Sequence, residues 1–248
     1  MFAIFKKELR AYFISPIGYV YVGLFLAASA LFCTMSTLQQ ASYNTSNYFQ
    51  YMIFAFIVVV PLLTMRAFSE ERKTRTEQLL LTAPVSITGM VLGKYFAALV
   101  LFVSTILVSC INFFPLISYA IVEQSQATDT ALHVGPEGGQ IVACVIGMML
   151  LGAACIAIGI FISSLTENQL SAAVITVATI AFMLLVGAFN QYISSAFLRT
   201  VLDWVSMLSR FDRFVYGLFD FAALLYYVSF VFVFLFLTVR IYEKRRWG

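Results

Sequence analysis

Long apolar stretches without a charged side chain recur along this 248-residue sequence. A stretch of about 18 or more such residues can cross the hydrocarbon core of a bilayer as a helix. Charged residues make up 11% of the chain and hydrophobic residues 62%, whereas a soluble domain carries roughly 25% charged residues. Because so few polar side chains could not cover a water-facing surface, we expect an all-α membrane protein with no soluble domain.

We expect six membrane spans, which form one transmembrane domain over residues 1–248. The expected spans are 17–38, 51–65, 88–121, 141–162, 169–190 and 221–239. The third is longer than a bilayer requires, which predicts tilt or a break at Pro115. Small residues in the fourth, among them Gly152 and Gly159, favour close helix packing. A capping-box pattern at 164–167 predicts the start of the fifth.

Two further segments are amphipathic. Residues 1–15 place apolar side chains at helical spacing beside Lys6, Lys7 and Arg10, which is typical of a short helix in the membrane interface. Residues 191–220 favour one interfacial or re-entrant helix on the outer side of the membrane. The apolar face of that helix would consist of Phe197, Leu198, Val201, Leu202, Val205 and Leu208.

The most polar stretch of the chain covers residues 66–87. Ser69 is a suitable N-cap, and Glu70 and Glu71 would lie in the first turn, where they favour the helix dipole. The pattern predicts one short helix parallel to the membrane, ended by Pro84. This helix would carry two i,i+4 ion pairs, Glu71 with Arg75 and Lys73 with Glu77. From these residues alone, a solvated connector and a docking site for a partner are equally good interpretations.

The distribution of basic residues predicts the orientation in the membrane. With the N-terminus inside, all of the 15 Lys and Arg except Arg199, Arg210 and Arg213 lie on or near the cytoplasmic side. We therefore expect both termini in the cytoplasm.

The sequence offers little material for catalysis or ion coupling. The stretch Gly89–Lys94 is one residue short of a phosphate loop and is followed by Tyr95, so glycine packing with a snorkelling Lys94 is the better interpretation. The single His133 cannot build a histidine-based zinc site. No Asp, Glu, Arg or His lies in the middle of an expected span, which argues against an ion-coupled carrier. If the chain transports a substrate, we expect the energy to come from a partner.

The order of these segments resembles the membrane subunits of type-2 ABC exporters with the type V fold. The matching stretches are Phe5–Arg10 with Ser15-Pro16, Arg66–Arg72, Thr76-Glu77, Leu79–Ser86, Gly93-Lys94 and Ser163–Thr166. The subgroup that the chain most resembles contains gliding-motility-type and copper-processing-type permeases. In such permeases an amphipathic elbow helix precedes six spans, a coupling helix lies between spans two and three, and a re-entrant outer segment lies between spans five and six.

The resemblance implies the permease subunit of an ATP-driven exporter in the bacterial plasma membrane. It implies two ABC ATPase subunits, which would bind the ATP and magnesium, and a second permease chain, identical or related. This chain would bind no cofactor, metal or nucleic acid, and lipids would surround it. Some members of the subgroup work with an auxiliary extracytoplasmic protein. The residues implied in ATPase coupling are Glu70, Glu71, Arg72, Glu77, Leu80 and Pro84, supported by Lys6, Lys7, Glu8 and Arg10 of the elbow helix.

Two other functions are compatible with the residues. The first is a six-span scaffold or regulatory subunit that transports nothing. The second is a secondary carrier, which the missing intramembrane charges disfavour. A gene for a P-loop ATPase beside this one would favour the exporter.

Overall fold

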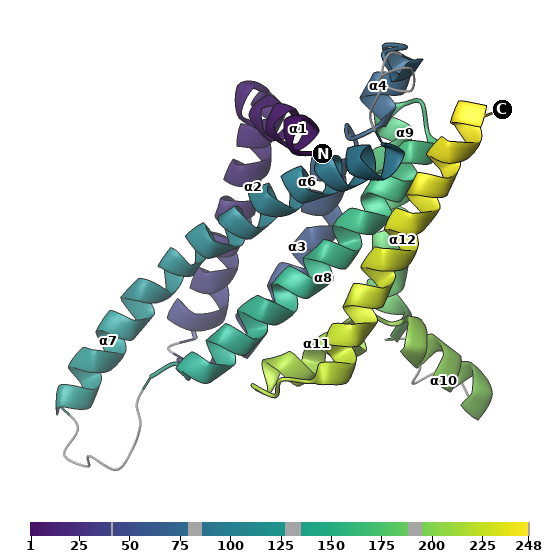
Figure 1. Ribbon diagram of the computed structural model, residues 1–248. Helices are drawn as coiled ribbons and strands as arrows, with labels where there is room; N and C mark the ends of the chain where they lie inside the picture. Colours follow the sequence, from purple (N-terminus) through teal and green to yellow (C-terminus); the bar gives the residue numbers. More distant parts are fainter. Residues whose placement is uncertain (41, 79–85, 127–134, 188–194, 248) are drawn as a thin grey trace.

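The computed structural model describes residues 1–40, 42–78, 86–126, 135–187 and 195–247. Within these ranges the chain forms helices and turns without a strand, which confirms the all-α prediction. The long helices pack side by side, and both termini lie at the same end of the molecule (Figure 1).

Five helical runs are long and apolar enough to cross a membrane. They are Pro16–Leu38 (α2, Pro16–Cys33, with a π-helical turn), Ser46–Lys73 (α3, Ser46–Thr64, with α4, Ser69–Lys73), Ile87–Glu123 (α6, Ile87–Ser109, with part of α7, Phe113–Gln126), Gly138–Leu165 (α8) and Phe221–Arg246 (part of α12, Phe221–Trp247). The expected span at 169–190 corresponds to α9 (Gln169–Leu185), a shorter apolar helix of 17 residues. Positions 188–190 lie outside the described residues, so this fifth expected span, and with it the total of six, stays a prediction.

A single serine separates the first two helices. α1 (Phe2–Ile14) ends at Ser15, whose extended backbone also makes it the N-cap of α2. The Ser15 hydroxyl accepts a hydrogen bond from the amide of Ile17 at 3.3 Å, and Pro16 takes the first helical position, where a missing N–H costs nothing. The chain therefore turns sharply from α1 into the first span.

The break in the third span lies just before the position predicted. A short 3-10 turn at Cys110–Asn112 separates α6 from α7. Pro115 is the third residue of α7, where its ring is tolerated because first-turn amides need no helical partner. The proline therefore begins the second helix instead of ending the first.

The predicted capping box at 164–167 is wrong. α8 continues to Leu165, and the hydroxyl of Ser164 donates to the carbonyl of Phe161 within that helix. The N-cap of α9 is Asn168, whose side chain accepts from the amide of Leu170 at 3.1 Å. The connection between the two helices is nevertheless as short as predicted.

The outer segment forms two helices where one was predicted. α10 covers Ala196–Val205 and α11 covers Leu208–Val215. Between them Ser206 has extended backbone and Met207 is fully buried, with its amide donating to the carbonyl of Met183 in α9. Burial of Met207 against the bundle outweighs continuation of the amphipathic helix.

Glycines in α8 allow close helix contacts, as predicted. A Cβ placed on Gly152 would lie 2.0 Å from the ring of Phe102 in α6, and one on Gly159 would lie 2.2 Å from the hydroxyl of Thr64 in α3. Phe102 also packs edge-on against Phe56 at 5.3 Å. The core of the bundle therefore lies around α8.

Candidate functional site

Both termini lie at one end of the bundle in Figure 1, and the ion pairs place a group of charged side chains at that end. They come from α1, the connector after α3 (defined as residues 66–78), the start of α6, the turn after α8 and the end of α12. This charged layer consists of Glu8, Arg66, Glu70, Glu71, Arg72, Glu77, Lys94, Glu167 and Arg245.

The connector does not form the single helix that the sequence predicted. α4 ends at Lys73, turns follow at 74–76, and Arg75 takes a positive φ of 58°. The hydroxyl of Thr74 donates to the carbonyl of Glu70 at 2.9 Å and shares a hydrogen bond with Thr76. Because such hydroxyls compete with the helix for its backbone groups, the helix stops here.

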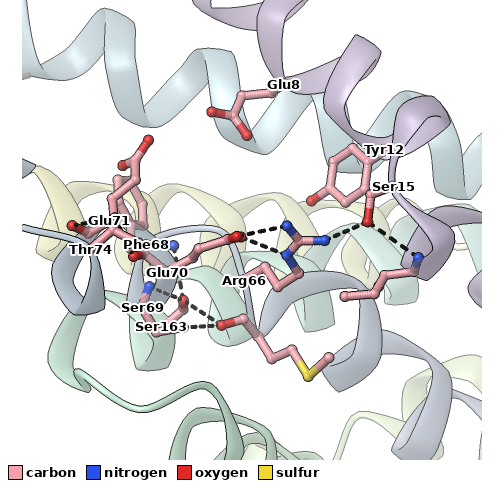
Figure 2. Close-up of polar contacts among 12 residues, drawn as sticks. Glu8, Tyr12, Ser15, Arg66, Phe68, Ser69, Glu70, Glu71, Thr74 and Ser163 are labelled. Carbon is pink, nitrogen blue, oxygen red and sulfur yellow. Dashed lines mark hydrogen bonds and ion pairs between the residues drawn. The ribbon is translucent and has the colours of Figure 1, made fainter. Parts of the chain in front are cut away.

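The start of α4 is capped from another helix. Phe68 is the N-cap, and Ser69, which the sequence predicted for that role, donates its hydroxyl to the carbonyl of Met65. The hydroxyl of Ser163 in α8 accepts from the amides of Phe68 at 3.1 Å and Ser69 at 3.2 Å (Figure 2). It also donates to Met65. One buried serine of α8 therefore fixes the position of the connector.

Lys94 is the central cation of the charged layer. Its Nζ lies 2.9 Å from the carboxylate of Glu8 and 2.8 Å from that of Glu71, and 5.1 Å from the ring centre of Phe68. Its side chain is 2% exposed, so the prediction of a snorkelling lysine is wrong. The predicted Glu71–Arg75 pair is replaced by the pair with Lys94, because α4 ends before Arg75.

The glycine before Lys94 explains how this contact forms. A Cβ on Gly93 would lie 3.2 to 3.3 Å from Ile4, Met1 and Phe5. α1 therefore packs closely on the first turns of α6 and brings Glu8 to the lysine. This supports the predicted glycine packing face, whose close contact with α1 places Glu8 beside Lys94.

Arg66 joins the connector to the turn between α1 and α2. Its guanidinium donates to both carboxylate oxygens of Glu70, at 2.6 and 2.8 Å, and to the hydroxyl of Ser15 at 2.5 Å (Figure 2). Nearby, the hydroxyl of Tyr12 donates to the carbonyl of Leu63 at 3.1 Å. Burial raises the pKa of Tyr12, so this phenol stays a neutral donor.

Arg72 and Glu77 connect the connector to α8, α9 and α12. Arg72 contacts Glu167 at 2.7 Å, Glu77 at 3.5 Å and the carbonyl of Leu165 at 2.9 Å. Glu77 also contacts Arg245 of α12 at 3.1 Å. The predicted Lys73–Glu77 pair is therefore wrong, since Glu77 faces the bundle.

Residues 28–239 match the family model described as ABC-2 family transporter protein. The chain belongs to the ABC-2 transporter family. No curated protein matches the chain. The family match and the apolar helices make the chain a multi-pass membrane protein and a transport permease that is not itself catalytic. The predicted resemblance is thus confirmed at the level of the family.

The ABC-2 permease brings most of the predicted coupling residues together. Glu8, Glu70, Glu71, Arg72 and Glu77 all lie in the charged layer. Lys7 lies at its edge, 66% exposed and 3.8 Å from Glu71. Lys6 and Arg10 lie on an exposed face of α1, and Leu80 and Pro84 fall outside the described residues.

Five residues of this permease were not predicted as part of the site: Arg66, Lys94, Ser163, Glu167 and Arg245. A single lysine near the start of an apolar helix, with Glu pairs elsewhere in the chain, was the available signal for Lys94. Among the described residues no group of His, Cys, Asp or Glu could hold a metal ion, and His133 lies outside them.

Proposed function

We infer that this ABC-2 permease is the membrane subunit of an ATP-driven exporter in the bacterial plasma membrane, with six spans and both termini in the cytoplasm. Two ABC ATPase subunits would supply ATP hydrolysis with their own ATP and magnesium, and a second permease chain would complete the transporter. The resemblance of the sequence motifs to known permeases favours the type V fold and the gliding-motility or copper-processing subgroup.

One observation carries this proposal: the connector forms ion pairs with the bundle on one side and is exposed to solvent on the other. Glu71 and Glu77 face the bundle and pair with Lys94 and Arg245. Residues 73–76 are exposed, and Lys73 and Arg75 have no ion pair within the described part of the chain. A force applied to the exposed turn would reach α1, α6, α8 and α12 through contacts that already exist.

The mechanism follows from these contacts. An ATPase bound to the turn would displace α4 as its nucleotide site closes. Because Glu71 is bonded to Lys94 and Ser163 caps α4, this displacement would move the ends of α6 and α8 with it. The chain converts the movement of a partner into a movement of its spans, and supplies no chemical step.

The test is purification of the tagged chain in mild detergent, with mass spectrometry to identify any bound ATPase and ATP hydrolysis measured on the eluate. We expect a stoichiometric ATPase with the unmodified chain and its loss with Lys73→Glu/Arg75→Glu. The matched control is Lys244→Glu/Arg246→Glu at the end of α12, which changes charge equally and should retain the ATPase.

The exposed pair is a sharper target than Glu70 and Glu71. Reversing Glu71 would leave Lys94 facing a new cation and would disturb the fold itself. Retention of the ATPase in Lys73→Glu/Arg75→Glu would overturn the docking site. Recovery of the unmodified chain without any ATPase would overturn the exporter and favour a scaffold.

A further inference from the structure

A groove of about 480 Å³ runs between α6 and α12, a volume within the range of about 300–1,000 Å³ that ligand pockets have. Its lining includes Tyr95, Leu235 and Val239, each less than 10% exposed. Phe96 and Phe232, which also line it, are exposed at the surface. Neither the charged layer nor the connector contributes to this groove.

The groove is lined by apolar side chains and Tyr95 except at one end, which is polar. The α12 residues that line it recur every three or four positions from Val228 to Glu243, which places them on one face of the helix. Arg240 and Glu243 lie at the end nearest the C-terminus, with Thr88 at the start of α6. This is the end of the bundle that carries the charged layer (Figure 1).

The polar end holds one cation and one anion side by side. The guanidinium of Arg240 lies 4.9 Å from the ring centre of Phe236 and 2.8 Å from the carboxylate of Glu243. The two side chains are 63% and 37% exposed, so their mutual ion pair is weak and easily exchanged for other partners.

The length of the groove matches one leaflet of a membrane. From Val228 to Arg240 the helix rises about 18 Å at 1.5 Å per residue. Half of a hydrocarbon core of about 30 Å is about 15 Å. A groove that is apolar over this length, and polar only where the headgroups begin, has the dimensions of a single acyl chain with its headgroup.

We propose that this groove binds a phospholipid with a phosphoethanolamine headgroup, with one of its two acyl chains between α6 and α12, its phosphate on Arg240 and its ammonium on Glu243. Arginine suits phosphate because its guanidinium donates two parallel hydrogen bonds. A carboxylate 2.8 Å from that guanidinium suits a primary ammonium, which a methylated headgroup lacks.

The lining argues against a partner helix as the occupant. Helices that associate within a membrane approach each other through Gly, Ala and Ser. The residues that line this groove include no Gly, Ala or Ser, and its exposed edges contain phenylalanines. A flexible acyl chain fits between aromatic walls that would hold another helix at a distance.

The experiment is native mass spectrometry of the full chain taken from nanodiscs with equal parts of phosphatidylethanolamine, phosphatidylcholine and phosphatidylglycerol. We expect one phosphatidylethanolamine per chain after extensive detergent washing. Arg240→Gln should weaken retention about tenfold, as expected for loss of a charge-assisted hydrogen bond. The control Arg246→Gln, one exposed arginine further along α12, should leave retention unchanged.

Two further variants separate the chain site from the headgroup site. Val228→Trp would block the far end of the groove, so long-chain phosphatidylethanolamine should be lost while a short-chain form still binds; Val174→Trp on the exposed face of α9 is its control. Glu243→Gln should abolish the preference over phosphatidylcholine. Equal retention of all three lipids by the unmodified chain, unchanged retention in Val228→Trp, or displacement of the lipid by soluble phosphoethanolamine would each overturn the proposal.

Discussion

The two ends of this helix bundle are held together by different chemistry. At the end with the termini, the buried Lys94 joins Glu8 and Glu71 from two other segments. In the opposite half, neutral groups make the same kind of long-range connection. There the amide of Asn112 donates to Ser29 at 2.8 Å, and the hydroxyl of Tyr227 donates to the carbonyl of Met207 at 2.8 Å.

The difference shows which end can transmit a change. Removing one partner of a neutral hydrogen bond leaves a single polar group without its partner, at a cost of about 1–3 kcal/mol. Removing one partner of a buried ion cluster leaves a charge without compensation, at a cost of about 3–5 kcal/mol. The charged end therefore responds more strongly to any partner that moves its groups, whereas the neutral half holds the helices in place.

The largest effect should come from Lys94→Met. Without the ammonium, Glu8 and Glu71 repel each other beside an apolar side chain. We expect a loss of about 3 kcal/mol, the lower end of the range for a broken buried ion pair, because the two carboxylates keep contact with solvent. The measurement is the free energy of unfolding by SDS in mixed micelles.

A triple variant distinguishes charge from packing as the cause. Glu8→Gln/Glu71→Gln/Lys94→Met removes all three charges and should regain most of the lost stability. If Lys94→Met lost less than about 1 kcal/mol, the range of a solvated pair, the contrast between the two ends would be contradicted.

The second effect, in the neutral half, should come from Tyr227→Phe. The phenol is fully buried, and its loss leaves the carbonyl of Met207 without this donor. We expect about 1–2 kcal/mol of destabilisation, unchanged between low and high salt because no charge is involved. Ser229→Ala, which removes an exposed hydroxyl two residues further along α12, is the control. A clear salt dependence in Tyr227→Phe would be inconsistent with this assignment.

A smaller effect is expected at the rim of the charged layer, from Arg72→Gln. Arg72 is 17% exposed, but its closer partner Glu167 is 75% exposed and its contact with Glu77 is longer, at 3.5 Å, so solvent partly screens the interaction. We expect about 0.5–1 kcal/mol at low salt and less at high salt. The neighbouring Lys73→Gln, on the exposed side of α4, should change neither value. A salt-independent loss of stability in Arg72→Gln would mean that Arg72, like Lys94, forms ion pairs that solvent does not screen.

The sequence was sufficient for the helical class and for most helix positions. The thickness of a bilayer sets the length of a span, so an uninterrupted apolar stretch defines it. Proline marked the region of the break in the third span but not its position, because Pro115 is tolerated in a first turn. The break at Ser206 was not predicted, since it depends on burial of Met207 against α9, a tertiary contact.

For the candidate site, the sequence identified Glu8, Glu70, Glu71, Arg72 and Glu77 but not their partners. Glu71 was assigned a partner four residues away because a continuous helix was assumed, yet the threonines after Lys73 end that helix. The actual partner, Lys94, lies 23 residues further along the chain. Local periodicity cannot indicate such a contact, which depends on how α1, α4 and α6 pack.

The smallest effect tests an ion pair whose cation is exposed, since Arg213 is 56% exposed whereas Lys94 is 2% exposed. Among its described residues, the neutral half contains one ion pair, between Arg213 and Asp220 just before α12. The amide of Ala222 donates to Asp220, and together with Arg213 this lowers the pKa of that carboxyl. A carboxyl with a lowered folded-state pKa adds stability above its unfolded pKa of about 4 and loses it as pH falls through the folded value. We therefore expect Asp220→Asn to cause a small loss of stability at neutral pH, where the carboxylate contributes fully, and to flatten the dependence of unfolding on pH below about pH 4. A large loss of stability at neutral pH in this variant would mean that burial of the cation does not decide how much an ion pair stabilises this bundle.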